Sequence, residues 1–119
     1  MSYYSDLKFT TSAIGFKKLK EMFKEHNVDL EKRIEIDTRT PDKYYNPTYM
    51  LTMYDINHIE NTDEYIVIKK FMSYADLNQM PYSYARIGET LEDVEIEDNW
   101  STSDYDIVRL EVLRRINEY

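Results

Sequence analysis

The chain has 119 residues with 23 acidic and 15 basic side chains, so its formal net charge is -8. This length and an apolar fraction of 42% predict a single folded domain over residues 1–119 with one core, and they argue against disorder. The absence of cysteine excludes disulfides, thiolate metal sites and thiol nucleophiles.

The first part of the chain predicts a strand followed by a helix. Residues 3–10 alternate loosely between apolar and polar side chains, which is typical of a strand. A helix is predicted over 13–26, with Thr11 or Ser12 as its cap and Asn27 as its stop signal. The apolar side chains recur at helical spacing on one side of this helix, at Phe16, Leu19 and Phe23.

Two further strands are predicted in the middle of the chain. Residues 32–37 alternate with Ile34 and Ile36 inward, as expected of a short edge strand. Residues 38–48 contain two prolines, which predict a loop. Residues 49–57 alternate again, but apolar side chains fall on both faces, so both faces of this strand are expected to be covered.

A second helix is predicted over 62–77. Asn61, followed three positions later by Glu64, resembles a capping box at its start. The β-branched residues of this segment also have strand propensity, which leaves a strand as the alternative. The apolar stripe that favours the helix consists of Tyr65, Ile68, Phe71, Met72 and Ala75.

The last predicted elements are strands. One strand covers residues 82–88, where Gly88 marks a turn or bulge. Another covers 93–97, with Val94 and Ile96 pointing inward. Its outward row consists of Asp93, Glu95 and Glu97, at intervals of roughly 6.6 Å along one face.

This order of elements predicts an α+β fold. Two helices are expected to cover one face of an antiparallel or mixed sheet of four to six strands, close to a ferredoxin-like arrangement. Residues 107–117 fit either a strand or a helix, and the alternation of Val108, Leu110 and Val112 favours the strand.

The sequence shows no recognisable reaction chemistry. The two histidines, His26 and His58, lack the spacing of a metal site, and no serine lies in a nucleophile turn. Two glycines cannot form a phosphate-binding loop, and the spacing of a calcium-binding loop is absent. We therefore expect a protein that is not an enzyme and that uses no metal and no cofactor.

Nothing in the sequence indicates a membrane protein. No apolar run approaches the roughly 20 residues that a spanning helix needs. The first ten residues lack the basic and apolar regions of a secretory signal. A cytoplasmic location is therefore expected, and the sequence does not define an oligomeric state.

The net charge is concentrated in one segment. Residues 87–108 contain eight acids and no Lys or Arg, whereas the 15 acids elsewhere equal the 15 bases. This segment is the predicted partner-binding surface. Its acids are Glu89, Glu92, Asp93, Glu95, Glu97, Asp98, Asp104 and Asp106.

Two interpretations of these acids compete. Acids on a hairpin can serve only to keep the protein soluble and to block edge-to-edge aggregation. However, surfaces built for solubility usually mix both signs, and like charges aligned on a strand repel one another. A basic partner protein, such as one that normally binds nucleic acid, would relieve this repulsion. Direct binding to nucleic acid or to an anionic membrane is not expected.

Two segments carry a resemblance. They are LKFTTSAIGFKKLKE near the start and YSYARIGETLEDVEIED later, which contains the motif Arg86, Ile87, Gly88 and Glu89. Both segments resemble small proteins of phages and mobile elements from low-GC bacteria. Small acidic proteins of such elements include anti-CRISPR and other anti-defence inhibitors, several of which mimic DNA. The resemblance implies an inhibitor and transfers no functional residue.

Our leading hypothesis is a non-enzymatic, anti-CRISPR-like inhibitor that acts in the host cytoplasm. It would bind the basic groove of a CRISPR effector or a nuclease through residues 89–106. The contact set would be Glu92, Asp93, Glu95, Glu97 and Asp98. The alternatives are an immunity protein or antitoxin against a basic nuclease toxin, and a structural or accessory phage protein.

Overall fold

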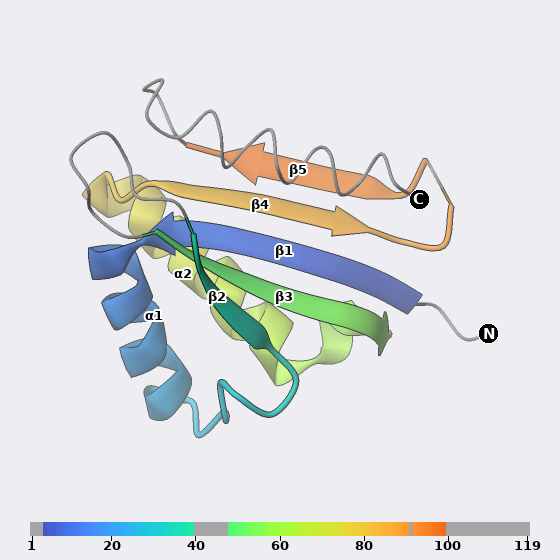
Figure 1. Ribbon diagram of the computed structural model, residues 1–119, viewed down its shortest axis with the longest axis horizontal. Coiled ribbons are helices and arrows are strands. Elements are labelled where there is room, and N and C mark those ends of the chain that lie inside the picture. Colours follow the sequence, from blue (N-terminus) through green and yellow to red (C-terminus); the bar gives the residue numbers. More distant parts are fainter. Residues whose placement is uncertain (1–3, 40–47, 91, 100–119) are drawn as a thin grey trace.

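The computed structural model describes residues 4–39, 48–90 and 92–99 (Figure 1). Side chains at positions 39 and 98 are not described. The predicted strand at 107–117 and the predicted contacts Asp104 and Asp106 lie outside the described residues.

The described residues form one five-stranded sheet and two α-helices. The strands follow the order β2-β3-β1-β4-β5, and every neighbouring pair is antiparallel. The elements in chain order are β1 (Tyr4–Ser12), α1 (Ala13–Glu25), β2 (Glu35–Arg39), β3 (Thr48–Asn57), the 3₁₀ turn η1 (Ile59–Asn61), α2 (Asp63–Asn78), β4 (Tyr82–Ile87) and β5 (Val94–Asp98). The predicted α+β fold is confirmed.

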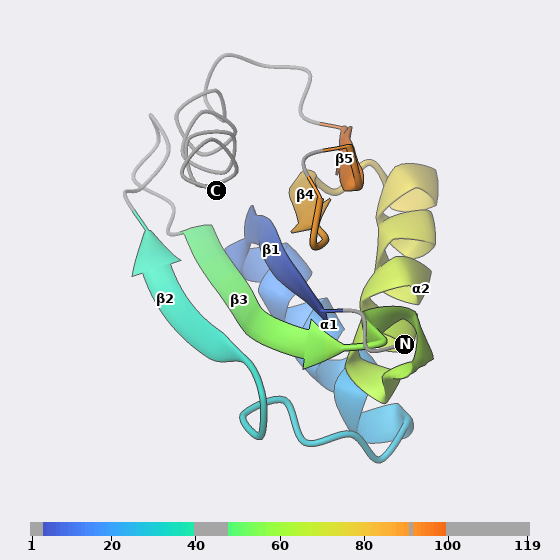
Figure 2. The ribbon, with the colours of Figure 1, turned by 90° about the vertical axis from the view of Figure 1, so that its right-hand side faces the viewer.

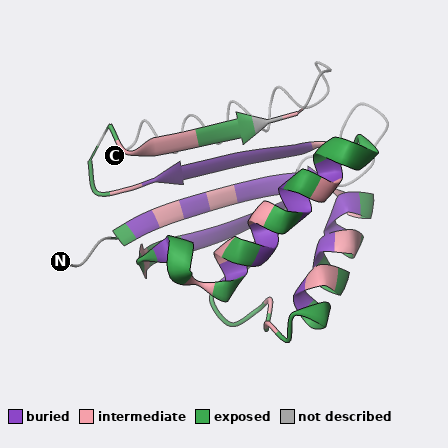
Figure 3. Cartoon of the chain, turned by 180° about the vertical axis from the view of Figure 1, so that it is seen from behind, coloured by how far each residue is buried: buried purple, intermediate pink, exposed green. Residues whose placement is uncertain are grey.

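Both helices lie on the same face of the sheet, as Figure 3 shows from the helical side. The chain runs β-α-β-β-α-β through the first four strands, and their order is that of a ferredoxin-like sheet. β5 is added beyond β4 by a hairpin, which places the described part of the acidic segment at an edge of the sheet (Figure 2).

The core lies between the helices and the sheet. The ring of Phe9 on β1 packs edge-on against Phe71 of α2 at 5.6 Å and stacks on Tyr82 of β4 at 6.0 Å. Phe16 of α1 stacks on Tyr49 of β3 at 4.4 Å. The predicted apolar faces of both helices therefore point into the core.

Helix α1 begins at the predicted residue and ends one residue earlier than predicted. The Ser12 hydroxyl accepts a hydrogen bond from the Gly15 N–H at 3.1 Å and caps the helix. Asn27 follows the last turn with a φ of 57°, a left-handed conformation that ends helices and that asparagine tolerates.

Helix α2 is capped differently from the prediction. Thr62, and not Asn61, is the cap, and its hydroxyl accepts from the Tyr65 N–H at 3.3 Å. Glu64 is only 4% exposed, and its carboxylate lies 3.5 Å from the Arg33 guanidinium. The predicted capping box is therefore wrong, because Glu64 ties the segment before β2 to the helix.

The strand register decides which side chains share a face. Phe9 lies opposite Tyr84, and Leu7 opposite Arg86, so Arg86 points to the helical face together with the core residues. β3 is buried on both faces, as predicted, since Met50 on the face opposite the helices is as fully buried as Leu51 on the helical face.

No helix in the described part of the chain is long and apolar enough to cross a membrane.

Candidate partner-binding site

The acids of β5 do not form the predicted outward row. Glu95 lies opposite Arg86 in the sheet, so it points to the helical face, while Ile96 points to the other face and is 42% exposed. The predicted assignment of Val94 and Ile96 as inward is therefore wrong. The pattern implied that the apolar side chains face the core. At this edge, however, the helical face offers cations, and these attract the carboxylates instead.

Arg86 holds two of the predicted contact residues. It is 9% exposed, and its guanidinium binds Glu95 Oε1 at 2.5 Å and Asp93 Oδ1 at 2.7 Å. It also donates to the Ser5 hydroxyl of β1 at 3.1 Å. Asp93 and Glu95 therefore neutralise a buried cation and join β5 to β4 and β1.

The surroundings of Glu95 extend this network to α2. Partial burial disfavours the charge of Glu95, but the hydrogen bond and charge of Arg86 outweigh it and hold the pKa of Glu95 below its ordinary value. Burial raises the pKa of Tyr84 far above its ordinary value, so its hydroxyl stays protonated and can donate to Glu95 at 3.4 Å. Lys69 of α2 lies 4.9 Å from the Tyr84 ring centre and 3.7 Å from Glu97.

The acids that remain exposed lie mainly in the turn between β4 and β5. This turn is closed by a hydrogen bond of 2.8 Å from the Gly88 N–H to the Asp93 carbonyl. Glu89 and Glu92 are exposed on it. Asp98 lies in β5, and its side chain is not described.

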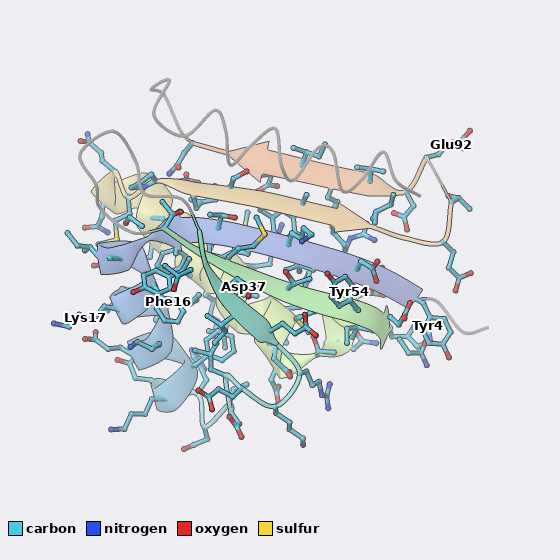
Figure 4. The ribbon with its side chains drawn as sticks, viewed as in Figure 1. Tyr4, Phe16, Lys17, Asp37, Tyr54 and Glu92 are labelled. Carbon is cyan, nitrogen blue, oxygen red and sulfur yellow. The ribbon has the colours of Figure 1, made fainter. Side chains whose placement is uncertain are left out.

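The fold brings two further carboxylates, those of Asp6 and Asp55, to the same end of the sheet as Glu89. Glu89 Oε1 accepts from the Tyr4 N–H at 2.9 Å, and Asp6 Oδ1 accepts from the Asp55 N–H at 2.8 Å. Figure 4 shows Tyr4 and Glu92 at this end, whereas Lys17 lies at the opposite end. We call this surface the acidic end, defined by the carboxylates of Asp6, Asp55, Glu89 and Glu92.

The acidic end contains a hollow with a volume of about 160 Å³. Three of the described residues that line it are acids, and none of these described residues is a Lys or Arg. The lining residues are Tyr4, Ser5, Asp6, Asp55, Ile87, Gly88 and Glu89.

Sequence reasoning missed Asp6 and Asp55. They lie on β1 and β3, far in sequence from the acidic segment, and they meet Glu89 only because β1 lies between β3 and β4. No local pattern marks them. The strand order of a ferredoxin-like sheet, taken together with the register, is the signal that could have found them.

The described residues contain no group of three or more His, Cys, Asp or Glu side chains that could together hold a metal ion. Both His26 and His58 are exposed, at the end of α1 and at the start of η1. Neither histidine lines the hollow of the acidic end.

Comparisons with protein-family models, with curated proteins and with solved structures gave no significant match to this chain.

Proposed function

We propose that this protein is a non-enzymatic inhibitor whose acidic end binds a basic, nucleic-acid-binding surface of a host defence protein. The partner is a CRISPR effector of the Cas9 type, and the inhibition is by DNA mimicry. The observation that carries the proposal is that three separate segments bring carboxylates to one end of the sheet.

The arrangement of these carboxylates supports the proposal. Asp6 and Glu89 each accept a backbone N–H, which holds the charged groups in place before a partner arrives. Ordered negative charges imitate the regularly spaced phosphates that a basic groove is built to bind. Such a surface also attracts its partner over a distance at low salt.

The contact set that we propose differs from the one predicted from the sequence. Asp93 and Glu95 are engaged by Arg86, so their charges are largely neutralised within the protein. The proposed contacts are therefore the acidic end, with Glu89 and Glu92 from the predicted segment and Asp6 and Asp55 from elsewhere.

The test is competition with DNA. A guide-loaded Cas9-type effector is mixed with labelled duplex DNA, and the protein is titrated at several salt concentrations. We expect the protein to displace the DNA, and the apparent affinity to fall as salt rises. The variant Glu89→Lys/Glu92→Lys should bind about ten-fold more weakly or worse at low salt, because reversed charges meet a basic groove.

A matched variant controls for net charge. Glu21→Lys/Glu25→Lys changes the total charge equally, at two exposed positions of α1. It should compete as well as the wild type. Equal losses in both variants would mean that total charge decides binding, and no displacement by the wild type would exclude this partner.

A further inference from the structure

The face of the sheet opposite the helices is buried, although both α-helices lie on its other side (Figure 3). Met50 of β3 and Thr10 of β1 are neighbours on this face and are fully buried, and Ser83 and Ala85 of β4 are only 2% and 3% exposed. Side chains stand out from the plane of a sheet, so strand neighbours alone do not enclose them. The Lys8 ammonium lies 3.6 Å from the Met50 sulfur, but one side chain does not enclose this whole row. A further layer must therefore cover it.

The described chain leaves the sheet beside this buried row. Asp98, the last residue of β5, pairs with Ser83. Asn99 then fixes the exit, because its side chain accepts from the Tyr82 N–H at 2.8 Å and donates to the Met80 carbonyl at 2.7 Å. The rest of the chain therefore starts at the edge of the face that needs a cover.

The sequence of residues 104–119 has the pattern of an amphipathic helix. At 3.6 residues per turn, apolar side chains gather on one side and charged ones on the other. The apolar stripe consists of Tyr105, Val108, Val112, Ile116 and Tyr119, and the charged side of Asp104, Glu111, Arg114, Arg115 and Glu118. A helix over this range would be about 24 Å long, and β4 is about 20 Å long. The other segments outside the described residues, 1–3, 40–47 and 91, are much shorter.

We propose that residues 104–119 form an amphipathic helix that packs on the sheet face opposite α1 and α2. This helix takes the place of the strand predicted over 107–117, because a strand added at the sheet edge would leave Met50 uncovered. An apolar cover also accounts for Thr10, whose buried hydroxyl has no hydrogen-bond partner among the described residues, since apolar side chains offer no acceptor. The face is then occupied by the chain itself and not by a partner.

Methionine oxidation measures the cover. Met50 and Met53 lie on opposite faces of β3, and both are fully buried. The variant Val112→Asp/Ile116→Asp places two carboxylates on the apolar stripe. Peroxide should then oxidise Met50 about ten-fold faster or more, because burying two charges costs more than a ten-fold change in an opening equilibrium represents. Met53 should stay protected by α1 and α2, and peptide mass spectrometry gives both rates.

A matched variant alters the charged side of the same segment. Glu111→Gln/Glu118→Gln should leave the oxidation rate of Met50 unchanged. If Met50 stays as protected in the aspartate variant as in the wild type, the proposal is wrong. If Met50 and Met53 both become reactive, the aspartate variant has unfolded, and a spin label on the folded protein decides.

The label locates the segment directly. The chain has no cysteine, so Glu111→Cys accepts a single nitroxide. In NMR spectra this label should broaden the amide signals of Thr10 and Ala85 more than those of α1 and α2, because the sheet lies between the label and these helices. A label at Glu21→Cys, which is exposed on α1, should do the reverse.

Two results of the labelling would overturn the proposal. One is stronger broadening of α1 and α2 than of the sheet by the label at position 111. The other is broadening of Thr10 by a label at Asp42→Cys and not by the label at position 111, which would assign the cover to residues 40–47.

Discussion

At the scale of single residues, two adjacent threonines on β1 differ in the hydrogen bonding of their hydroxyls. Thr11 is fully buried, and its hydroxyl donates to the Pro81 carbonyl at 2.9 Å. Thr10 is also fully buried, on the face of the sheet opposite the helices, and its hydroxyl has no hydrogen-bond partner among the residues that the structure describes. A buried hydroxyl without a partner costs free energy, whereas a bonded one contributes to stability.

Replacing each threonine with valine should therefore change stability in opposite directions. Thr10→Val should raise the free energy of unfolding by about 1 kcal/mol, because it removes an unpaired polar group at nearly constant shape. Thr11→Val should lower it by about 1 kcal/mol, because it breaks the bond to Pro81. Urea unfolding measures both values. Changes of the same sign would show that the two hydroxyls have the same environment.

Gly15 of α1 lies close against Thr11 of β1. A Cβ added there would overlap the Thr11 side chain and contact the ring of Phe71. Alanine would gain about 1 kcal/mol of helix propensity, but overpacking a core costs about 1–3 kcal/mol. Since Thr11 is held by its bond to Pro81, we expect Gly15→Ala to lower the melting temperature.

A double variant tests the cause. Thr11→Ala removes the overlapping hydroxyl, so Gly15→Ala/Thr11→Ala should lose less stability than the two single losses added together. If the two single losses simply add in the double variant, the loss in Gly15→Ala does not come from its overlap with Thr11.

At the scale of elements, β5 is attached to the sheet by charge as well as by backbone hydrogen bonds. Arg86 joins it to β4 and β1, and Lys69 connects it to α2. On the other face of β5, Ile96 is largely exposed and adds little packing. The attachment of this strand should therefore depend on the ionisation of its acids.

The lowered pKa of Glu95 gives this dependence a sign. The pKa of Glu95 is lower in the folded protein than in the unfolded chain, where it is about 4.3. The ionised carboxylate therefore stabilises the fold fully when the pH is above the pKa of the unfolded chain. This stabilisation is lost as the pH falls through the pKa of the folded protein. The difference in unfolding free energy between the wild type and Glu95→Gln should be largest near pH 7 and should shrink below about pH 4. Urea unfolding between pH 7 and pH 3 measures it.

The partner of Glu95 can be tested in the same way. In the Arg86→Met background the largest of the influences that lower the pKa of Glu95 is gone, and the more distant charge of Lys69 remains. The change in unfolding free energy that Glu95→Gln causes should then vary much less with pH between pH 7 and pH 3. An unchanged dependence would assign the effect to a group other than Arg86.

At the scale of the whole molecule, local patterns predicted the order of the described elements, with β2 starting three residues later than expected, but not the site. Helical spacing and alternation depend on neighbours in sequence, and the predicted bounds of α1 and α2 agree with the structure within one residue at each end. The face of β5 depends on its pairing with β4 and on the position of Arg86, which no local pattern contains. The same reason explains why Asp6 and Asp55 were not predicted.

The central position of β1 has a consequence for how the protein is made. β1 leaves the ribosome first among these strands, yet both of its neighbours come much later, β3 from residue 48 and β4 from residue 82. Contacts that join such distant segments slow folding, and an unpaired strand edge can pair with other chains. One edge of β1 in the growing chain therefore stays unpaired until residue 87 has emerged, and only then can the sheet close around this strand.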